Sequence, residues 1–321
     1  MVYRRKPAPS FFGSVSAPMG RRAFLGFATG AAGLAAVARI PTLSGDRVVI
    51  VGGGVAGLAT ARQIKASAPR SSVVLLDRYP GREAARLVEE GITVHAVDAV
   101  DVDWGRRRLH GWNGEVHDFD RLVVAPGVAF RTDAIDGYSG RAMDAMPAFW
   151  SGRSDEDRFM AWLTAVRTGG TIVIAAPPRP HRFMTGPYLR ANRAAHWLAV
   201  NNPRAKVILV DANPSPLLAL DGVERVVADV TGVDAGNRRL VTTAGALTGD
   251  LVNLIPAQWS GPFAQRAGLT DAAGWCPVDD ATCRSLSRDG AWVVGDATAL
   301  AGNKDAVTSL EQSRIAGSAF S

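Results

Sequence analysis

The sequence predicts an α/β protein with two dinucleotide-binding-like (Rossmann-type) domains, the second inserted in the first, preceded by a signal peptide. Three observations support this fold class. Residues 47–77 read as strand, glycine turn, helix and strand; residues 170–210 repeat the order strand, helix, strand; and a last buried strand ends at Asp296. We therefore expect a signal peptide over 1–38, a first domain over 45–145 and 256–321, and the inserted domain over 146–255.

The glycine turn is the most informative motif. A buried strand, 47–51, runs into Gly52-Gly-Gly-Val-Ala-Gly57 and an Ala-rich helix. Gly52 permits the tight turn, Gly54 lets a pyrophosphate approach the backbone, and Gly57 lets the helix pack closely on the strand. The N–H groups of the helix start would face the phosphates. The next strand ends at Asp77, where an acid that binds an adenosine ribose is expected. The alternative is that these glycines only make a tight turn.

Composition excludes one class of partner. The chain has 321 residues, 47% of them hydrophobic, which suits a globular protein of about two domains. The formal charge of +6 belongs to the leader, because residues 1–38 hold several arginines and a lysine but no acid. The rest shows no basic patch with interleaved aromatic residues, so no nucleic-acid partner is predicted.

The leader has the pattern of a twin-arginine export signal. Arg21-Arg22 precede a short apolar run rich in Gly and Ala, and Ala36-Val-Ala38 is a small-residue cleavage site. We expect the mature protein to begin near Arg39, in the periplasm, with no stable membrane anchor after cleavage. The alternatives are an uncleaved anchor and a non-specific hydrophobic helix, although the run is short for a bilayer span. This route carries folded proteins, which suits a chain that acquires its cofactor in the cytoplasm.

Two later strands end in informative turns. The strand within 119–127 ends in Ala125-Pro-Gly127, where the chain would turn close beside a cofactor. The strand within 291–297 delivers Gly295-Asp296 at its carboxyl end, where ligands of parallel sheets bind, and Asp296 could accept hydrogen bonds from a ribityl chain. The alternatives are an ordinary Pro-Gly turn for the first and a solvated acid at a strand end for the second.

The inserted domain lacks these features. Its first βα turn, 176–180, has no Gly-x-Gly and contains prolines, which remove N–H donors, so a second dinucleotide such as NAD is not expected there. His181 is a candidate acid or base, with a surface or packing role as the alternative. His196, beside Trp197 on a predicted helix, is expected to face the core.

The cysteines suggest no site. Cys276 and Cys283 match neither a C-x-x-C redox pair nor a zinc ligand set, and no metal site is predicted. Export makes a disulfide possible, but we favour two unlinked thiols.

These motifs together resemble those of two-dinucleotide-binding-domain flavoproteins, and in particular the flavoprotein subunit of flavocytochrome c sulfide dehydrogenase, a relative of sulfide:quinone oxidoreductases. The likeness runs from about Gly45 to Ala316. It rests on Val124-Ala-Pro-Gly127, Ala176-Pro-Pro178, Thr185-Gly-Pro-Tyr188, Leu254-Ile-Pro256, Ala267-Gly-Leu-Thr270, Gly274-Trp-Cys-Pro-Val278 and Gly295-Asp296.

The resemblance implies FAD as the cofactor, a small sulfur reductant, and a c-type cytochrome subunit as a possible partner. It also implies that the helix over 306–319 turns its amino end toward the flavin ring. The cofactor-binding residues that it implies are Gly52, Gly54, Ala56, Gly57, Asp77, Ala125, Gly127, Gly295 and Asp296.

The chain departs from the family pattern in three places. The long loop after the ribose-binding acid, with its flavin-linking cysteine, is absent, so FAD is expected to bind non-covalently. The redox cysteine pair above the flavin is replaced by Phe183 and Thr298. The carboxy-terminal interface domain is also not expected, because the chain stops at Ser321.

Two functions are compatible with these features. The first is a periplasmic FAD-binding oxidoreductase that passes electrons from a small (sulfur) reductant to a c-type cytochrome or quinone. The alternative is a catalytically silent flavin-fold protein that acts as a subunit or partner in sulfur oxidation. The phosphate and ribityl sites favour retained FAD binding, whereas the missing thiols predict poor sulfide turnover. No catalytic residue is predicted, so enzymatic activity is left open.

Overall fold

A computed structural model describes residues 45–150 and 153–320. The predicted signal peptide lies outside these residues. Within the described part of the chain, no helix is both long and apolar enough to cross a membrane. The described residues contain two parallel sheets, each at the centre of its own lobe, and both lobes belong to one compact unit.

The first sheet is built around the strand that leads into the glycine turn. In spatial order its strands are β17 (Ala291–Val293), β7 (Arg121–Val124), β1 (Arg47–Val51), β2 (Ser72–Asp77) and β3 (Thr93–Ala96). All adjacent pairs are parallel, with Val51 opposite both Leu76 and Val124. Strands from both ends of the chain therefore share one sheet, as the insertion of a second domain requires.

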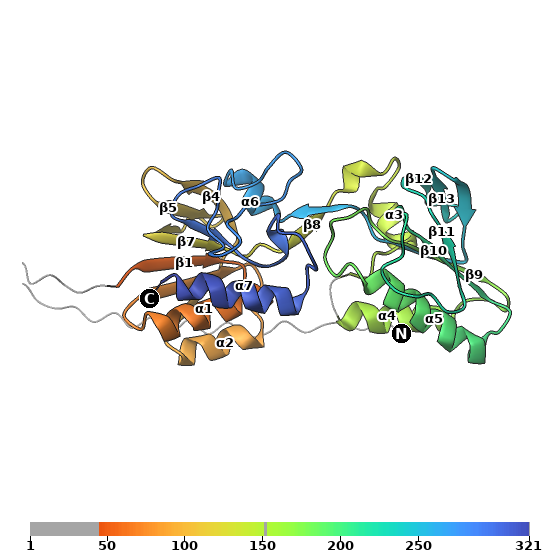
Figure 1. The fold of residues 1–321 in the computed structure, drawn as a ribbon, viewed down its shortest axis with the longest axis horizontal. Coiled ribbons are helices and arrows are strands. Elements are labelled where there is room, and N and C mark those ends of the chain that lie inside the picture. The colour runs from red at the N-terminus through yellow and green to blue at the C-terminus, as the bar shows by residue number, and fades with distance from the viewer. Residues whose placement is uncertain (1–44, 151–152, 321) are drawn as a thin grey trace, which may run out of the picture. The chain divides into compact units, whose positions relative to one another are not determined.

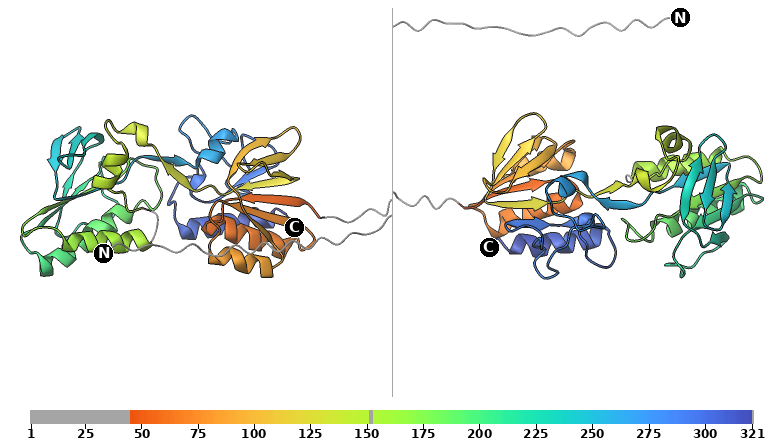
Figure 2. Two further views of the ribbon diagram at one scale, coloured as in Figure 1. Left: turned by 180° about the vertical axis from the view of Figure 1, so that it is seen from behind. Right: turned by 90° about the horizontal axis from the view of Figure 1, so that it is seen from above.

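Both faces of this sheet are covered, as is typical of parallel sheets. Val48 and Ile50 pack into a core with Ile64 of α1 and Leu87 of α2, while Val49 and Val51 pack into a second core with Phe263. Figures 1 and 2 show α1 and α7 side by side on one face. The elements around the sheet are α1 (Val55–Ser67), α2 (Arg82–Glu89), α7 (Ala306–Ser318), β4 (Ala99–Asp103), β5 (Arg108–Gly111), β6 (Val116–Asp118), α6 (Pro262–Arg266) and the 3-10 turn η2 (Gly295–Ala297).

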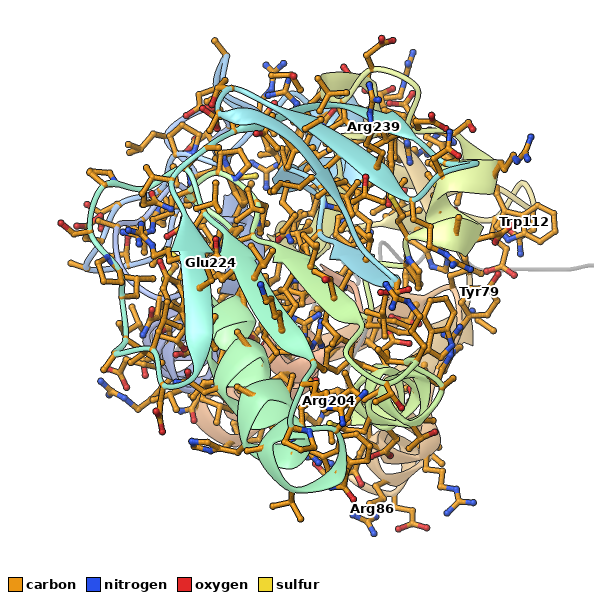
Figure 3. The ribbon with its side chains drawn as sticks, turned by 90° about the vertical axis from the view of Figure 1, so that its right-hand side faces the viewer. Tyr79, Arg86, Trp112, Arg204, Glu224 and Arg239 are labelled. Atoms are coloured by element: carbon orange, nitrogen blue, oxygen red, sulfur yellow. The ribbon has the colours of Figure 1, made fainter. Side chains whose placement is uncertain are left out.

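The second sheet has the order β11 (Val223–Val226), β10 (Lys206–Val210), β9 (Thr171–Ala175) and β15 (Leu251–Leu254), all parallel. One face packs against α4 (Arg153–Thr164) and α5 (Gly186–Asn201). The other packs against α3 (Gly140–Ala145) and the antiparallel strands β12 (Val230–Asp234), β13 (Arg239–Thr242) and β14 (Gly245–Thr248). Figure 3 views this lobe end-on, with Glu224 on β11 and Arg239 on β13.

The lobes are joined where β8 (Val128–Phe130) pairs with β16 (Gln258–Ser260), just before the 3-10 turn η1 (Thr132–Ala134). Ile135, Tyr138 and Ala142 already pack in the core of the second lobe, upstream of the expected boundary at Met146. The predicted fold class, with two Rossmann-type sheets, is confirmed.

Candidate functional site

The turn after β1 can be made only by glycine at two positions. Gly52 has φ +100°, and a Cβ there would lie 2.1 Å from the carbonyl oxygen of Ala125. A Cβ on Gly57 would lie 1.8 Å from the carbonyl oxygen of Gly52. Both glycines therefore allow backbone segments to approach closely. Gly52 lets the end of β1 lie against the end of β7, and Gly57 lets α1 pack against the turn.

Gly54 has a different role, because it faces open space. It is the N-cap of α1, with φ −76° and ψ −172°, a conformation open to any residue. A Cβ there would meet no atom within 4 Å. No side chain caps α1. The helix start thus presents N–H groups and a partial positive charge to the space in front of Gly54, which is an arrangement that binds phosphate.

Asp77, at the end of β2, lies over the same turn. Its Oδ2 accepts a hydrogen bond from the backbone N–H of Gly53 at 2.6 Å, and its Oδ1 accepts one from the N–H of Tyr79 at 2.7 Å. Only residues 78–81 separate β2 from α2, so no long loop follows Asp77. A carboxylate has lone pairs left after two such bonds, so a ribose hydroxyl can still bind.

Asp296 supplies the main unsatisfied polar group of the site. It lies in η2, where its Oδ2 is 3.3 Å from Nε of Arg182 and its Oδ1 is buried with no hydrogen-bond partner among the described residues. Burial raises the pKa of Asp296, although Arg182 and Lys304 oppose the shift. A buried carboxylate oxygen without a donor is costly, and a ligand hydroxyl at this position would satisfy it.

These residues line one space, which we call the turn cavity. Its volume is about 240 Å³. Of the nine predicted residues, all but Gly57 line it, and Gly57 lies beneath the turn. The predicted residues that line the turn cavity are Gly52, Gly54, Ala56, Asp77, Ala125, Gly127, Gly295 and Asp296. The structure therefore brings together three motifs that lie far apart in the sequence, with free N–H groups at one side and the unpartnered Asp296 oxygen at another. This donor and acceptor set fits the pyrophosphate and ribityl parts of FAD.

Two larger cavities adjoin the turn cavity. The strand cavity, about 660 Å³, lies beside β2 and 97–100 and shares Gly52, Asp77 and Pro126 with it. The helix cavity, about 590 Å³, lies between the start of α5 and residues 304–307 and shares Arg182, Asp305 and Ala306 with it. Each falls within the range of about 300–1,000 Å³ found for small-molecule sites. Through these shared residues the turn cavity adjoins both larger cavities, and we call the three together the cleft.

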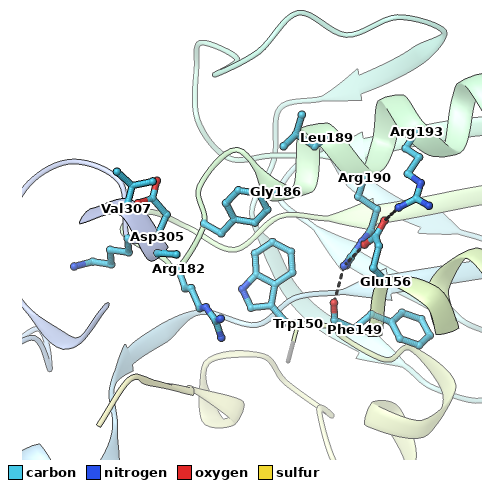
Figure 4. A pocket seen from close by; sticks show the side chains of 13 residues that line it. Phe149, Trp150, Glu156, Arg182, Gly186, Leu189, Arg190, Arg193, Asp305 and Val307 are labelled. Atoms are coloured by element: carbon cyan, nitrogen blue, oxygen red, sulfur yellow. Dashed lines mark hydrogen bonds and ion pairs between the residues drawn. The ribbon is translucent and has the colours of Figure 1, made fainter. Parts of the chain in front are cut away.

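The helix cavity has an ordered, charged wall, shown in Figure 4. Arg190 of α5 is only 6% exposed and donates hydrogen bonds to Glu156 at 2.8 Å and to the carbonyl of Phe149 at 2.6 Å. Arg193 lies 3.3 Å from the same carboxylate. A buried, fully bonded arginine of this kind holds α5 and the 149–150 segment in place.

Lys304 enters the site from the segment before α7. It is 4% exposed, its Nζ donates to the carbonyl oxygen of Thr298, and it lies 4.4 Å from the centre of the Trp275 ring. Burial lowers the pKa of Lys304 to about 8. Sequence reasoning missed Lys304, Arg182 and Arg190, because only the folded structure places each beside its partners. The one local signal in the sequence was that Lys304 directly precedes Asp305, the residue that caps α7.

The amino end of α7 adjoins the cleft, but one of its donors is taken. Asp305 is the N-cap and accepts a hydrogen bond from the N–H of Thr308 at 2.9 Å. Asp305 and Ala306 line both the turn cavity and the helix cavity. The predicted favourable end of the helix dipole is thus present, partly offset by the capping carboxylate.

The positions expected to hold redox thiols hold none. Phe183 is 43% exposed and lines the helix cavity, whereas Thr298 is 1% exposed. Cys276 lies beside Thr298, since its N–H donates to the carbonyl of Ala297 at 3.0 Å, but burial raises the pKa of its thiol to about 12. Cys283 is also buried, and its pKa is raised to about 11. Both cysteines are free, in agreement with the expectation of unlinked thiols.

The histidines near the site are not positioned for catalysis. His181 is 2% exposed, its Nδ1 lies 3.0 Å from the carbonyl oxygen of Arg182, and burial lowers its pKa to about 4. This supports the packing alternative.

The expectation that His196 faces the core is wrong: it is exposed and its Nε2 lies 2.9 Å from Asp221. The buried face of α5 runs through 191, 194, 195 and 198, which puts 196 on the opposite side.

Comparison with known proteins gives a family match for the central part of the chain. Residues 158–256 match the family model for the central region of the sulfide dehydrogenase (flavocytochrome c) flavoprotein chain. This match confirms the predicted relationship, and FAD as the cofactor agrees with it because the matched family is a flavoprotein chain. The match falls on the second lobe, whereas the glycine turn lies in the first.

Solved structures share the fold. The sulfide:quinone oxidoreductase of Aquifex aeolicus is 16% identical, with a TM-score of 0.70 over 84% of this chain and 75% of that one. An NAD-dependent persulfide reductase from A. fulgidus is 17% identical, with a TM-score of 0.63 over 84% of this chain but only 58% of that protein. Thioredoxin reductase of Lactococcus lactis is 16% identical, with a TM-score of 0.61 over 86% and 97% of the two chains.

Proposed function

We propose that this chain, a member of the sulfide dehydrogenase-like FAD oxidoreductase superfamily, binds FAD non-covalently in the cleft and passes electrons from a small sulfur reductant to a c-type cytochrome or quinone in the periplasm. The observation that carries the proposal is the turn cavity. At one side of it, the N–H groups at the start of α1 face open space in front of Gly54, where a phosphate can bind. At another side lies the buried Oδ1 of Asp296, which accepts no hydrogen bond from the described residues.

Each part of the cleft has a role toward the cofactor. N–H groups at the start of α1 bind the pyrophosphate, and Asp77 accepts a hydrogen bond from the adenosine ribose in the direction of the strand cavity. Asp296 accepts a hydrogen bond from a ribityl hydroxyl. FAD, when bound, supplies the ability to accept two electrons together and release them singly. The chain contributes binding and orientation.

The helix cavity is the place for the reductant. It adjoins the turn cavity, it is partly closed by Trp150 and Phe183, and Arg182 and Lys304 line it. These cations favour a small anionic sulfur compound over a cationic one. Lys304, with a pKa of about 8, can also hold or release a proton near neutral pH.

A second candidate function is a silent flavin-fold subunit that binds a partner in sulfur oxidation. The specific observation in its favour is the chemistry of residues 183 and 298. Phe183 cannot form a persulfide, and Thr298 is buried with its hydroxyl bonded to the carbonyl of Gly295 at 3.2 Å.

Electron transfer separates the two functions. The FAD-loaded protein, reduced anaerobically by light and EDTA, is mixed with an oxidised c-type cytochrome or a water-soluble quinone. We expect the flavin to be reoxidised as the acceptor is reduced, since FAD in an open cleft lies within reach of solvent acceptors. A flavin that stays reduced with both acceptors would contradict the oxidoreductase function and favour the silent subunit.

Location is tested through the leader. We expect conversion of Arg21 and Arg22 to lysine to hold the precursor in the cytoplasm, because the export route requires the arginine pair. Cell fractionation with immunoblotting measures the distribution, and a single change of Arg5 to lysine is the control for charge-neutral changes in the leader. Normal export of the double variant would overturn the proposed location.

A further inference from the structure

Three metal-binding side chains converge at the edge of the first sheet, away from the glycine turn. His95 lies on β3, His117 lies on β6, and Glu115 directly precedes β6. One ligand atom from each lies within 4.8 Å of the others. The three residues come from strands in two different sheets, so no sequence motif announces the group.

The distances suit a single transition-metal ion. Oε2 of Glu115 is 3.4 Å from Nδ1 of His95 and 3.3 Å from Nε2 of His117. Zinc binds nitrogen and oxygen at about 2.0–2.2 Å, so two ligands of a tetrahedral ion lie about 3.4 Å apart. The carboxylate oxygen and the two imidazole nitrogens thus already stand at ligand separations, with the rings edge to face at 5.1 Å.

Asn113 orients the carboxylate of Glu115. Nδ2 of Asn113 donates a hydrogen bond to Oε1 of Glu115 at 2.7 Å, and the N–H of Glu115 donates to Oδ1 of Asn113 at 3.1 Å. This leaves Oε2 directed at the two histidines. Such second-layer hydrogen bonds are typical of carboxylate ligands in metal sites.

His117 is the anchor of the group. Its side chain is only 12% exposed, and its Nε2 is buried with no hydrogen-bond partner. His95 and Glu115 are more open, at 38% and 43%, and Trp112 of the same hairpin projects from the surface (Figure 3), so an ion can reach the site.

We propose that His95, Glu115 and His117 form a mononuclear site for a divalent transition metal of the zinc class, with water in the remaining position. Two imidazoles and one carboxylate favour zinc, cobalt, nickel or copper over magnesium and calcium, which prefer oxygen ligands alone. The bound ion would tie the β5–β6 hairpin to the edge strand β3. It would thereby hold 97–100, which follow β3 and line the strand cavity, whether or not FAD is bound.

Zinc binding is measured by titration calorimetry on the mature full-length protein after treatment with a chelator. We expect one ion per chain, a rise in Tm with zinc, and the visible spectrum of a four-coordinate ion when cobalt(II) is used instead. His95→Gln and His117→Gln should each weaken zinc binding at least about tenfold, and Asn113→Ala by about tenfold or more. His196→Gln, which removes a histidine that faces only Asp221, is the matched control and should bind zinc as the native protein does.

The variants must be shown to fold, by circular dichroism and by a Tm without metal close to that of the native protein. FAD binding is followed separately, so failure of the proposed oxidoreductase function would leave this test intact. Absence of stoichiometric binding in the native protein would overturn the site. So would zinc or cobalt binding that persists unchanged in a His95→Gln, His117→Gln double variant, because the ion would then be held elsewhere.

Discussion

Gly54→Val is expected to leave the protein folded but unable to bind FAD. A Cβ at Gly54 meets no atom within 4 Å and the backbone there is extended, so the substitution causes no internal clash. The branched side chain instead fills the space in front of α1, where the pyrophosphate must approach. Loss of two charge-assisted hydrogen bonds, at about 1.5–3 kcal/mol each, weakens binding roughly 10²- to 10⁴-fold.

Fluorescence titration with FAD measures this loss, and the Tm of the apoprotein reports on the fold. Gly140→Val is the control, because Gly140, the first residue of α3, also has open space at its Cβ but lies outside the cleft. It should bind FAD normally. Gly57→Val should instead destabilise the protein, since its Cβ would overlap the carbonyl oxygen of Gly52. Native affinity in Gly54→Val would refute the proposed phosphate site.

The second large effect concerns sulfide. We expect sulfide to reduce the bound flavin poorly or not at all, because no activated thiol stands over the site to capture sulfur. With pKa values raised to about 12 and about 11, Cys276 and Cys283 are almost entirely protonated near neutral pH. Both are fully buried, so very little of either thiol is present as the reactive thiolate.

Stopped-flow bleaching of the flavin by sulfide measures the rate, with a Cys276→Ser, Cys283→Ser double variant as the comparison. The native protein and the double variant should behave alike. Fast bleaching in the native protein that is lost in the double variant would assign the missing thiol role to these two cysteines. Fast bleaching in both would point to direct attack on the flavin without thiols.

Local patterns were enough to predict the first βαβ unit. The strands 47–51 and 72–77 are as expected, because short apolar runs, glycines and a terminal acid all act over short distances. Helix α5 begins at Gly186, with Pro187 in its first turn. Proline is favourable in the first turn of a helix, where its missing N–H costs nothing.

Pairings between distant residues could not be predicted. The contact of Arg182 with Asp296 depends on how the second lobe meets the first. The bond from Lys304 to Thr298 lies within the first lobe and the bonds of Arg190 lie within the second, so these depend on how loops and helices pack inside each lobe. The His95–Glu115–His117 group likewise depends on the hairpin β5–β6 lying against β3. In each case the residue type was visible, but its partner was fixed only by tertiary structure.

The central claim is that the cleft holds FAD without a covalent bond, and the absorption spectrum of the purified exported protein tests it most directly. We expect the two visible bands of an oxidised flavin, and complete release of the yellow colour into the supernatant after acid precipitation, since neither cysteine lines the cleft beside the glycine turn. Colour retained in the pellet would contradict non-covalent binding. A colourless protein that takes up no added FAD would contradict the claim itself.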